Sequence, residues 1–181
     1  MKAICAVAHP DDCIIFAYSF IHAHPELDWT ILYLTYTPWD SRGKELNDFW
    51  ARRNIPVIFL GFKDDWRDIE NKSISFDAEQ AGREIKNIIQ DYDIVLTHNQ
   101  QGEYGHLHHV LVHESCAGHA NLITFADRNN GTQLSIPPGV YTLDELPEHG
   151  EIIAGFHSQD HVNDYHIPEH VKIILADKDC K

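Results

Sequence analysis

Short apolar runs that alternate with helical patterns fill the first 120 residues, and this alternation constrains the fold more than any other feature. The runs typical of buried strands lie at residues 3–7, 29–35, 57–60 and 92–97. The helical patterns lie at residues 12–23, 44–53 and 78–91. Strands that alternate with helices favour a parallel sheet with right-handed crossovers. We therefore expect an α/β fold: a doubly wound (Rossmann-like), mainly parallel sheet with helices on both faces.

The first apolar run leads directly into Ala8-His9-Pro10-Asp11-Asp12. Because ligands collect at the carboxyl ends of strands in such a sheet, this motif is expected at the mouth of a site. His9 and Asp12 can bind one Zn²⁺ ion, since imidazole and carboxylate groups are both zinc ligands, and Asp11 then remains to act on a metal-bound water. The alternative is that the two aspartates only cap the next helix.

A histidine-rich motif follows the fourth run, where Gly102-Glu103-Tyr104-Gly105 leads into four residues that include three histidines. His106 and His109 are three residues apart and share one face of a helix, whereas His108 is expected to point elsewhere. The two motifs end strands at the same edge of the predicted sheet. Together they predict an open metal site with two histidines and one carboxylate: His9, Asp12 and His109.

The pair of motifs resembles the PIG-L (LmbE-like) family of zinc-dependent N-acetylglucosaminyl deacetylases. The resemblance rests on His9-Pro10-Asp11-Asp12 and on Gly102-Glu103-Tyr104-Gly105-His106-x-x-His109, and it extends to the order of elements up to about residue 115. It implies a hydrolase that removes an N-acetyl group from an N-acetylglucosamine-like amino sugar or its conjugate. The implied cofactor is Zn²⁺, and the implied partner is a small-molecule amino-sugar substrate.

The resemblance also implies three catalytic residues. Asp11 corresponds to the general base that activates the attacking water. Tyr104 is similar in position to the tyrosine that stabilises the oxyanion, and the alternative is that its hydroxyl only anchors a loop. His106 resembles the family's histidine that is not a metal ligand, stabilises charge and helps the amine to leave.

Three further residues are substrate-binding candidates by the same resemblance: Arg42, Asp64 and Asp65. Arg42 begins an Arg-x-x-Glu pattern, and its forked guanidinium suits sugar hydroxyls or a phosphate. The alternative for Arg42 is a surface ion pair with Glu45. Asp64 and Asp65 follow the third run, and one of them is expected to bind sugar hydroxyls. The stretch His157-Ser158-Gln159 is a further candidate.

The chain departs from the family pattern at two positions. Family members often have an Asp where this chain has His108, and that acid is expected to orient His106 and favour its cationic form. Either another carboxylate replaces it here, or His106 acts mainly as a neutral donor. Cys13 stands where the family commonly has Glu, and we expect it to be a small buried residue rather than a nucleophile or ligand.

Composition limits the partners of the chain. A net charge of −14 argues against nucleic acid, because nucleic-acid affinity comes largely from Lys and Arg. No apolar stretch approaches the roughly 20 residues that span a bilayer, so stable membrane insertion is not expected. The four cysteines form no C-x-x-C pair and are expected to be reduced thiols. These features predict a cytoplasmic protein.

The length of 181 residues is that of one domain, and we expect residues 1–181 to form a single deacetylase domain. The pattern weakens beyond about residue 120, where short strands are expected at 121–125, 152–156 and 171–176. Residues 120–181 are expected to complete the sheet and the substrate pocket.

Two other functions fit the same ligand set. One is a ferrous oxygenase that uses the two histidines and the carboxylate as a facial triad. The other is a non-catalytic metal-binding domain of the same fold. The sequence specifies neither the aglycone of the sugar nor whether the chain forms a homo-oligomer.

Overall fold

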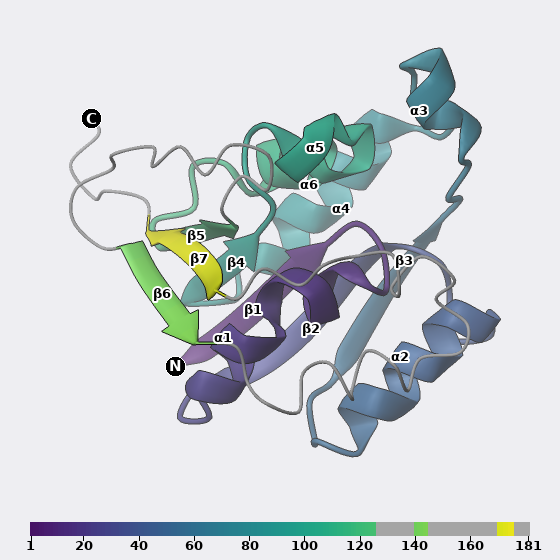
Figure 1. The fold of residues 1–181 in the computed structure, drawn as a ribbon. Helices are drawn as coiled ribbons and strands as arrows, with labels where there is room; N and C mark the ends of the chain where they lie inside the picture. The colour runs from purple at the N-terminus through teal and green to yellow at the C-terminus, as the bar shows by residue number, and fades with distance from the viewer. Residues whose placement is uncertain (126–139, 145–169, 176–181) are drawn as a thin grey trace.

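The computed structural model describes residues 1–125, 140–144 and 170–175, which contribute seven strands to one sheet in the order β3-β2-β1-β4-β5-β7-β6 (Figure 1). Five strands pair in parallel: β1 (Lys2–Val7), β2 (Asp28–Thr35), β3 (Val57–Phe62), β4 (Ile94–Thr97) and β5 (Leu122–Phe125). β7 (His170–Leu175) pairs antiparallel with β5, and β6 (Val140–Asp144) pairs antiparallel with β7. The prediction of a doubly wound, mainly parallel α/β fold is confirmed.

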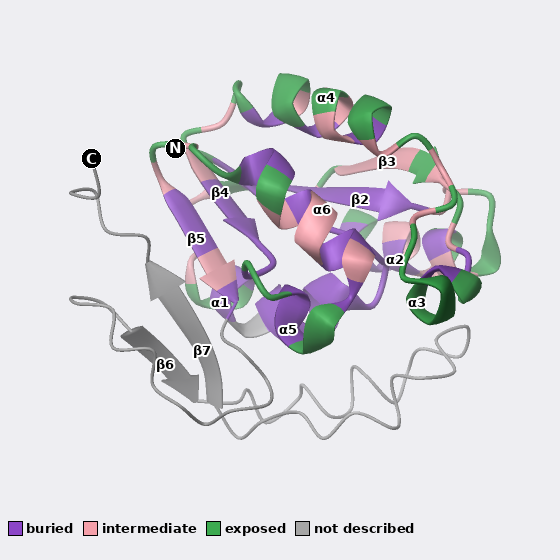
Figure 2. Ribbon diagram, turned by 90° about the horizontal axis from the view of Figure 1, so that it is seen from above, coloured by how far each residue is buried: buried purple, intermediate pink, exposed green. Residues whose placement is uncertain are grey.

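Helices cover both faces of this sheet (Figure 2). The first face packs against α1 (Tyr18–Ala23) and α2 (Ser41–Ala51), and the second against α4 (Ala78–Ile89) and α6 (Leu107–Cys116). Alternate residues of β1 enter the two cores, because successive side chains of a strand point to opposite faces. Ala3, Cys5 and Val7 join the first core, and Ile4 and Ala6 join the second. All five are buried, which explains why the run is apolar throughout.

The best-defined helix of the sequence, α4, forms close to its predicted bounds. Its buried positions Ala81, Ile85 and Ile89 recur at helical spacing and face the second core. The side chain of Asp77 caps its first turn by accepting a hydrogen bond from the Gln80 backbone N–H at 2.9 Å.

Two segments differ from the prediction. The single helix expected at 12–23 begins as a π-helix, η1 (Cys13–Ala17), before it continues as α1. The polar stretch 66–75, which lies outside the helical patterns of the sequence, contains the short helix α3 (Arg67–Asn71). Asp68 turns inward there and accepts hydrogen bonds from the backbone N–H and the hydroxyl of Ser75, both at 3.1 Å. A buried aspartate of this kind leaves no hydrophobic period in the sequence.

The described part of the chain includes two of the strands expected after residue 120, near 121–125 and 171–176, and one that was not expected, β6. The strand expected at 152–156 and the candidate stretch His157-Ser158-Gln159 lie outside the described residues. Among the described residues, no helix is both long enough and apolar enough to cross a bilayer.

The chain leaves β1 and β4 toward opposite faces of the sheet. η1 follows β1 on the first face, and α6 follows β4 on the second. β1 and β4 are hydrogen-bonded neighbours, so their carboxyl ends meet where the winding of the sheet reverses. This switch point is where open α/β sheets bind ligands.

Candidate metal and active site

His9, Asp12 and His109 converge at the carboxyl ends of β1 and β4, and all three are buried. His9 Nδ1 lies 3.2 Å from Asp12 Oδ2 and 3.2 Å from His109 Nε2, and His109 Nε2 lies 3.3 Å from Asp12 Oδ2. A tetrahedral zinc ion with bonds of about 2.0–2.1 Å places neighbouring ligand atoms about 3.3 Å apart. The three atoms therefore fit a zinc-sized cation.

Asp12 does not cap the helix that follows it. η1 has no side-chain hydrogen bond from its N-cap residue, Asp12, whose Oδ2 instead accepts the His9 backbone N–H at 2.8 Å. Burial raises the pKa of Asp12, but His109 and His9 outweigh it and hold that pKa well below its ordinary value. The group is therefore a carboxylate, as a metal ligand must be.

Glu103 orients His109. Its Oε2 lies 2.6 Å from His109 Nδ1 and 2.8 Å from His98 Nδ1, and its Oε1 accepts the Asn99 backbone N–H at 2.9 Å. Burial raises the pKa of Glu103, but His98 and His109 outweigh it and lower that pKa to about 2. Because the carboxylate accepts the Nδ1–H of His109, the Nε2 lone pair is directed toward Asp12.

An unusual backbone conformation around Glu103 places its carboxylate beside His98 and His109. Gly102, Glu103 and Gly105 in α5 (Gly102–Gly105) have φ values of 63°, 58° and 87°. Such a φ is strained for a residue other than glycine, and strain of this kind concentrates at functional sites. At Gly102, an added Cβ would lie 3.2 Å from the Cβ of His109, so the turn also needs the small residue.

His98 and Glu103 were missed as functional residues. The available signal was a carboxylate close in sequence to a predicted zinc histidine, since such histidines usually donate their second N–H to a carboxylate. His98 Nε2 lies 3.4 Å from Asp12 Oδ2, so it is a geometric alternative to His9 as a ligand. However, the same Nε2 accepts the Ala8 backbone N–H at 3.0 Å, which occupies its lone pair. His98 therefore supports the site and stacks on His109, with ring centroids 3.8 Å apart.

His106 lies beside the three candidate ligands, with its ring 4.6 Å from that of His9 and stacked on His109 at 4.7 Å. Its Nδ1 accepts the His108 backbone N–H at 3.2 Å, so the ring proton of the neutral form is on Nε2. Burial, followed by the charges of His9 and His109, lowers the pKa of His106 to about 2. Of the two alternatives left open by the sequence, this geometry favours a neutral donor. Tyr104 is 42% exposed, and its ring centroid lies 5.8 Å from that of His106.

The expectation that His108 points away from the site is wrong. Its Nδ1 lies 3.1 Å from His9 Nε2, and its Nε2 lies 3.0 Å from Asp68 Oδ2. The first turn of α6 is enclosed on two sides, by β1 and by the segment that contains α3, so two of its faces contribute to the site. Burial, followed by the charge of His9, lowers the pKa of His108 and favours its neutral form.

Arg42 points into the site. Its Nη2 donates to Asp11 Oδ1 at 2.8 Å, and its Nη1 donates to the Tyr36 hydroxyl at 2.9 Å. That hydroxyl donates in turn to Asp64 Oδ2 at 2.9 Å. Burial, followed by the charge of Asp12, raises the pKa of Asp11, while Arg42 opposes the rise.

The two acids predicted as substrate-binding candidates, Asp64 and Asp65, lie in different surroundings. Asp64 faces the site, with its Oδ1 3.6 Å from His9 Nε2. Asp65 accepts hydrogen bonds from Arg67 Nη2 at 2.6 Å and from Lys63 Nζ at 2.8 Å. Of the pair, only Asp64 is placed beside the candidate ligands.

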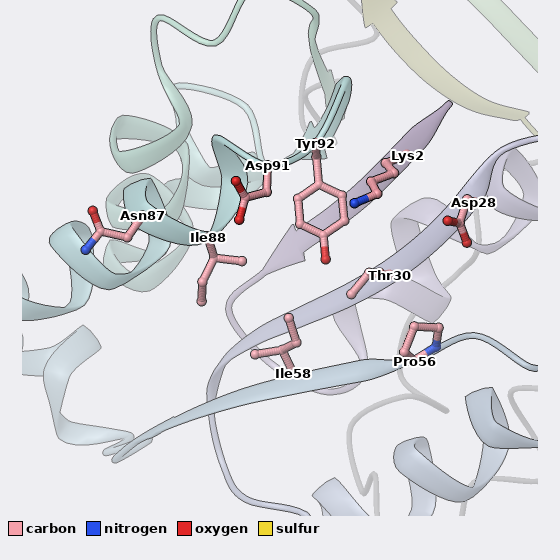
Figure 3. A pocket seen from close by; sticks show the side chains of 9 residues that line it. All are labelled: Lys2, Asp28, Thr30, Pro56, Ile58, Asn87, Ile88, Asp91 and Tyr92. Atoms are coloured by element: carbon pink, nitrogen blue, oxygen red, sulfur yellow. The ribbon is translucent and has the colours of Figure 1, made fainter.

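A separate pocket of about 490 Å³ lies at the opposite end of the sheet (Figure 3). It is lined by the amino ends of β1, β2 and β3 and by the end of α4, including Lys2, Asp28, Asp91 and Tyr92. One length of β1, on the order of 17 Å at 3.3 Å per residue, separates it from the histidines. Its lining contains no histidine or cysteine, so it offers neither of the nitrogen and sulfur ligands that zinc prefers.

Comparison with protein-family models and with solved structures gives several matches to this chain. The family model described as PIG-L, GlcNAc-PI de-N-acetylase, matches residues 4–118. This range includes every candidate site residue named above except the stretch His157-Ser158-Gln159. No curated protein sequence gives a significant match.

Several solved structures share the fold. A deacetylase of teicoplanin biosynthesis in complex with teicoplanin has a TM-score of 0.64 at 11% identity, covering 98% of this chain and 100% of that chain. GalB, the 4-carboxy-2-hydroxymuconate hydratase from Pseudomonas putida KT2440, has a TM-score of 0.64 at 14% identity, covering 98% and 97%. N,N'-diacetylchitobiose deacetylase from Pyrococcus horikoshii has a TM-score of 0.57 at 14% identity, covering 93% and 71%. At these identities the likeness shows the fold alone.

Proposed function

This chain belongs to the PIG-L family, and on that premise we propose that it is a zinc-dependent amidohydrolase that removes an N-acetyl group from an N-acetylglucosamine-like amino sugar or its conjugate. The observation that carries the proposal is the triangle of His9 Nδ1, Asp12 Oδ2 and His109 Nε2, with sides of 3.2–3.3 Å, beside Asp11. Three protein ligands leave a zinc ion one open position, as in catalytic sites.

Zn²⁺ bound by these three side chains would supply Lewis-acid chemistry, polarising a carbonyl oxygen and lowering the pKa of a water molecule beside it. Asp11 accepts a proton from the attacking water as the general base. Arg42 holds one of its two carboxylate oxygens, which fixes the group and favours its ionised form. Asp11 is therefore oriented before the substrate binds.

We assign the developing oxyanion to two donors of this chain. The neutral His106 carries its proton on Nε2, because its Nδ1 accepts a backbone N–H. Tyr104 is 42% exposed and its ring lies 5.8 Å from that of His106, and we propose its hydroxyl as the second donor. Donors fixed in place before the reaction stabilise a transition-state charge more than mobile water does.

The sugar is proposed to bind beside Arg42 and Asp64, whose side chains are each 20% exposed. Residues 120–181 are proposed to complete the pocket, and within them β5, β7 and β6 extend the sheet beyond β4, at the edge opposite β3. The net charge of −14 supports a neutral or cationic small molecule rather than a nucleic acid. The free, buried thiols of Cys5, Cys13 and Cys116 support a reducing cytoplasm.

The test is acetate release from N-acetylglucosamine and N,N'-diacetylchitobiose by the zinc-loaded chain, with Asp11→Asn as the variant. We expect kcat to fall by roughly 10²–10⁴-fold, the usual contribution of a general base, while one zinc per chain remains bound. Asp77→Asn, the same change at the exposed cap of α4, is the matched control and should keep wild-type activity.

An Asp11→Asn chain that holds zinc and hydrolyses acetamides as fast as wild type would refute the assignment of the base. A wild-type chain that binds zinc but releases no acetate from any N-acetyl sugar would support the non-catalytic alternative. Oxygen-dependent turnover with iron in anaerobically purified protein would support the oxygenase.

A further inference from the structure

The histidine ligand on β1 has two ring nitrogens with different neighbours. His9 Nδ1 faces Asp12 and His109, whereas His9 Nε2 faces His108 and Asp64. A neutral imidazole carries one proton, and only the unprotonated nitrogen can bind a metal. The metal site therefore requires the proton of His9 on Nε2, and something must keep it there.

Asp68 and His108 supply this constraint. Asp68 is 3% exposed, and its Oδ2 lies 3.0 Å from His108 Nε2. A carboxylate only accepts, so the proton of a neutral His108 is on Nε2 and its Nδ1 has a lone pair. That Nδ1 lies 3.1 Å from His9 Nε2, so His9 must be the donor in this contact.

We infer that Asp68 and His108 are positioning residues that set the tautomer of His9 through the chain Asp68–His108–His9 and so prepare Nδ1 for the metal. The inference rests on the metal site of the proposed function. It assigns to His108 a task different from the one that the family's acid has at this position. It also gives the buried carboxylate of Asp68 a purpose beyond holding Ser75.

The same chain links the substrate side to the metal. Asp68 lies four residues after Asp64, on the segment between β3 and α4. The segment is anchored to α6 by the contact between Asp68 and His108, 40 residues apart. A displacement of this segment by a bound sugar would therefore reach His9 through two hydrogen bonds.

The same atoms suggest a second interpretation, a second cation held by His9 Nε2, His108 Nδ1 and Asp64 Oδ1. It would require His9 to lose the proton on Nε2 and bind two ions through one ring. The distances favour the hydrogen bond, because the two nitrogens are 3.1 Å apart while Asp64 Oδ1 is 3.6 Å from His9 and 3.9 Å from His108. The stoichiometry of zinc separates the two interpretations.

The experiment measures zinc affinity of the metal-free full chain by competition with a chromophoric chelator. We expect Asp68→Asn to weaken zinc binding by about tenfold, the lower end of what loss of a supporting carboxylate costs. Asp65→Asn is the matched control, since this buried acid on the same segment pairs with Lys63 and Arg67. Ser75→Ala is the second control, because it removes only the hydroxyl that donates a hydrogen bond to Asp68 and leaves the contact between Asp68 and His108 in place. Both controls should keep the wild-type affinity.

A second readout excludes mere loosening of the segment. The d–d absorption bands of the Co²⁺-loaded chain should shift in Asp68→Asn and stay unchanged in Ser75→Ala. If Asp68→Asn does not fold, as judged by circular dichroism, His108→Gln interrupts the same chain of hydrogen bonds at its middle member and should show the same weakening of zinc binding.

Three outcomes would overturn the inference. Equal zinc affinity of Asp68→Asn and wild type would refute it while leaving the proposed function intact. Two zinc ions per wild-type chain, falling to one in His108→Gln, would make His108 a ligand instead. A wild-type chain that binds no zinc would refute both the inference and the proposed function.

Discussion

The two histidines of the candidate metal site are supported in different ways. His109 is supported directly by Glu103, six residues earlier, through one 2.6 Å contact within the stretch that joins β4 to α6. His9 is supported by His108, 99 residues later, which depends in turn on Asp68. The His109 side is complete once a single turn has folded. The His9 side exists only after three distant segments have docked.

Exposure to water divides the site along a different line, into a dry side around His109 and Glu103 and a wetter side around Asp11 and Arg42. The side chains of His98, His109 and Glu103 are fully buried. Across the site, the side chains of Arg42 and Asp64 are each 20% exposed, and that of Asp11 is 10% exposed. Electrostatic contacts are stronger where water is excluded, so the dry side is suited to holding a metal. The wetter side is suited to exchanging a substrate and a proton.

The largest expected effect breaks the dry side. We expect Glu103→Gln to lower the free energy of unfolding of the metal-free chain by about 3 kcal/mol, because it leaves two buried histidines without their anion. Zinc affinity should fall by roughly 10–100-fold, since His109 loses the group that fixes its tautomer. Urea unfolding and chelator competition measure the two quantities.

Glu114→Gln is the control for Glu103→Gln, because Glu114 is an exposed acid on the same helix as His109. It should change neither quantity. A Glu103→Gln chain as stable as wild type would show that His98 and His109 need no buried anion beside them. The contrast between the dry and the wetter side of the site would then be wrong.

A smaller effect depends on pH. The pKa of His106 is about 2 in the folded chain, against an ordinary value of 6.5. As pH falls below 6.5, the unfolded chain binds a proton at this position and the folded chain does not, so stability falls. The loss should approach about 1.4 kcal/mol per pH unit, and it should total about 2 kcal/mol between pH 6.5 and 4.5, because the unfolded imidazole is already half protonated at pH 6.5.

Unfolding free energies of metal-free wild type and His106→Gln across this range test the pH effect. The variant should show the shallower decline, and His22→Gln, at an exposed position of α1, should decline like wild type. Equal slopes for His106→Gln and wild type would mean that the folded site accepts the proton.

The fold and the convergence of the two motifs follow from local patterns in the sequence. Four apolar runs predicted the strands β1 to β4. Because parallel strands end at one edge of a sheet, the same runs predicted that His9 and His109 lie close together, as they do. The π-helical start of the first helix could not be predicted from the sequence. A π-helix differs from an α-helix only because each hydrogen bond spans five residues instead of four. Cys13 is buried in the first core, as expected, with its thiol 2.6 Å from the Tyr33 hydroxyl.

The supporting carboxylates could not be predicted, for a physical reason. A buried acid is recognised by what it contacts, and the contacts of Glu103 depend on a positive φ that a non-glycine residue rarely adopts. Asp68 depends on how a polar segment docks 40 residues from its partner His108. Neither leaves a periodic signal, so sequence spacing predicted the candidate ligands, which the fold brings together, and missed the residues that support them.

The smallest expected effect comes from a substitution on the wetter side of the site, at Arg42. Arg42 lies 2.8 Å from Asp11 and opposes the rise in the Asp11 pKa that burial and Asp12 cause. Removing the positive charge in Arg42→Gln should raise the Asp11 pKa further, because an opposite charge favours the ionised form. A general base must be deprotonated, so the acidic limb of the profile of kcat/KM against pH should move up by about one pH unit. Arg53→Gln is the control, since Arg53 packs over Phe49 away from the site and should leave the limb in place. An unmoved limb in Arg42→Gln would mean that Arg42 contacts Asp11 without tuning it, and the division of labour between the two sides would then rest on the metal alone.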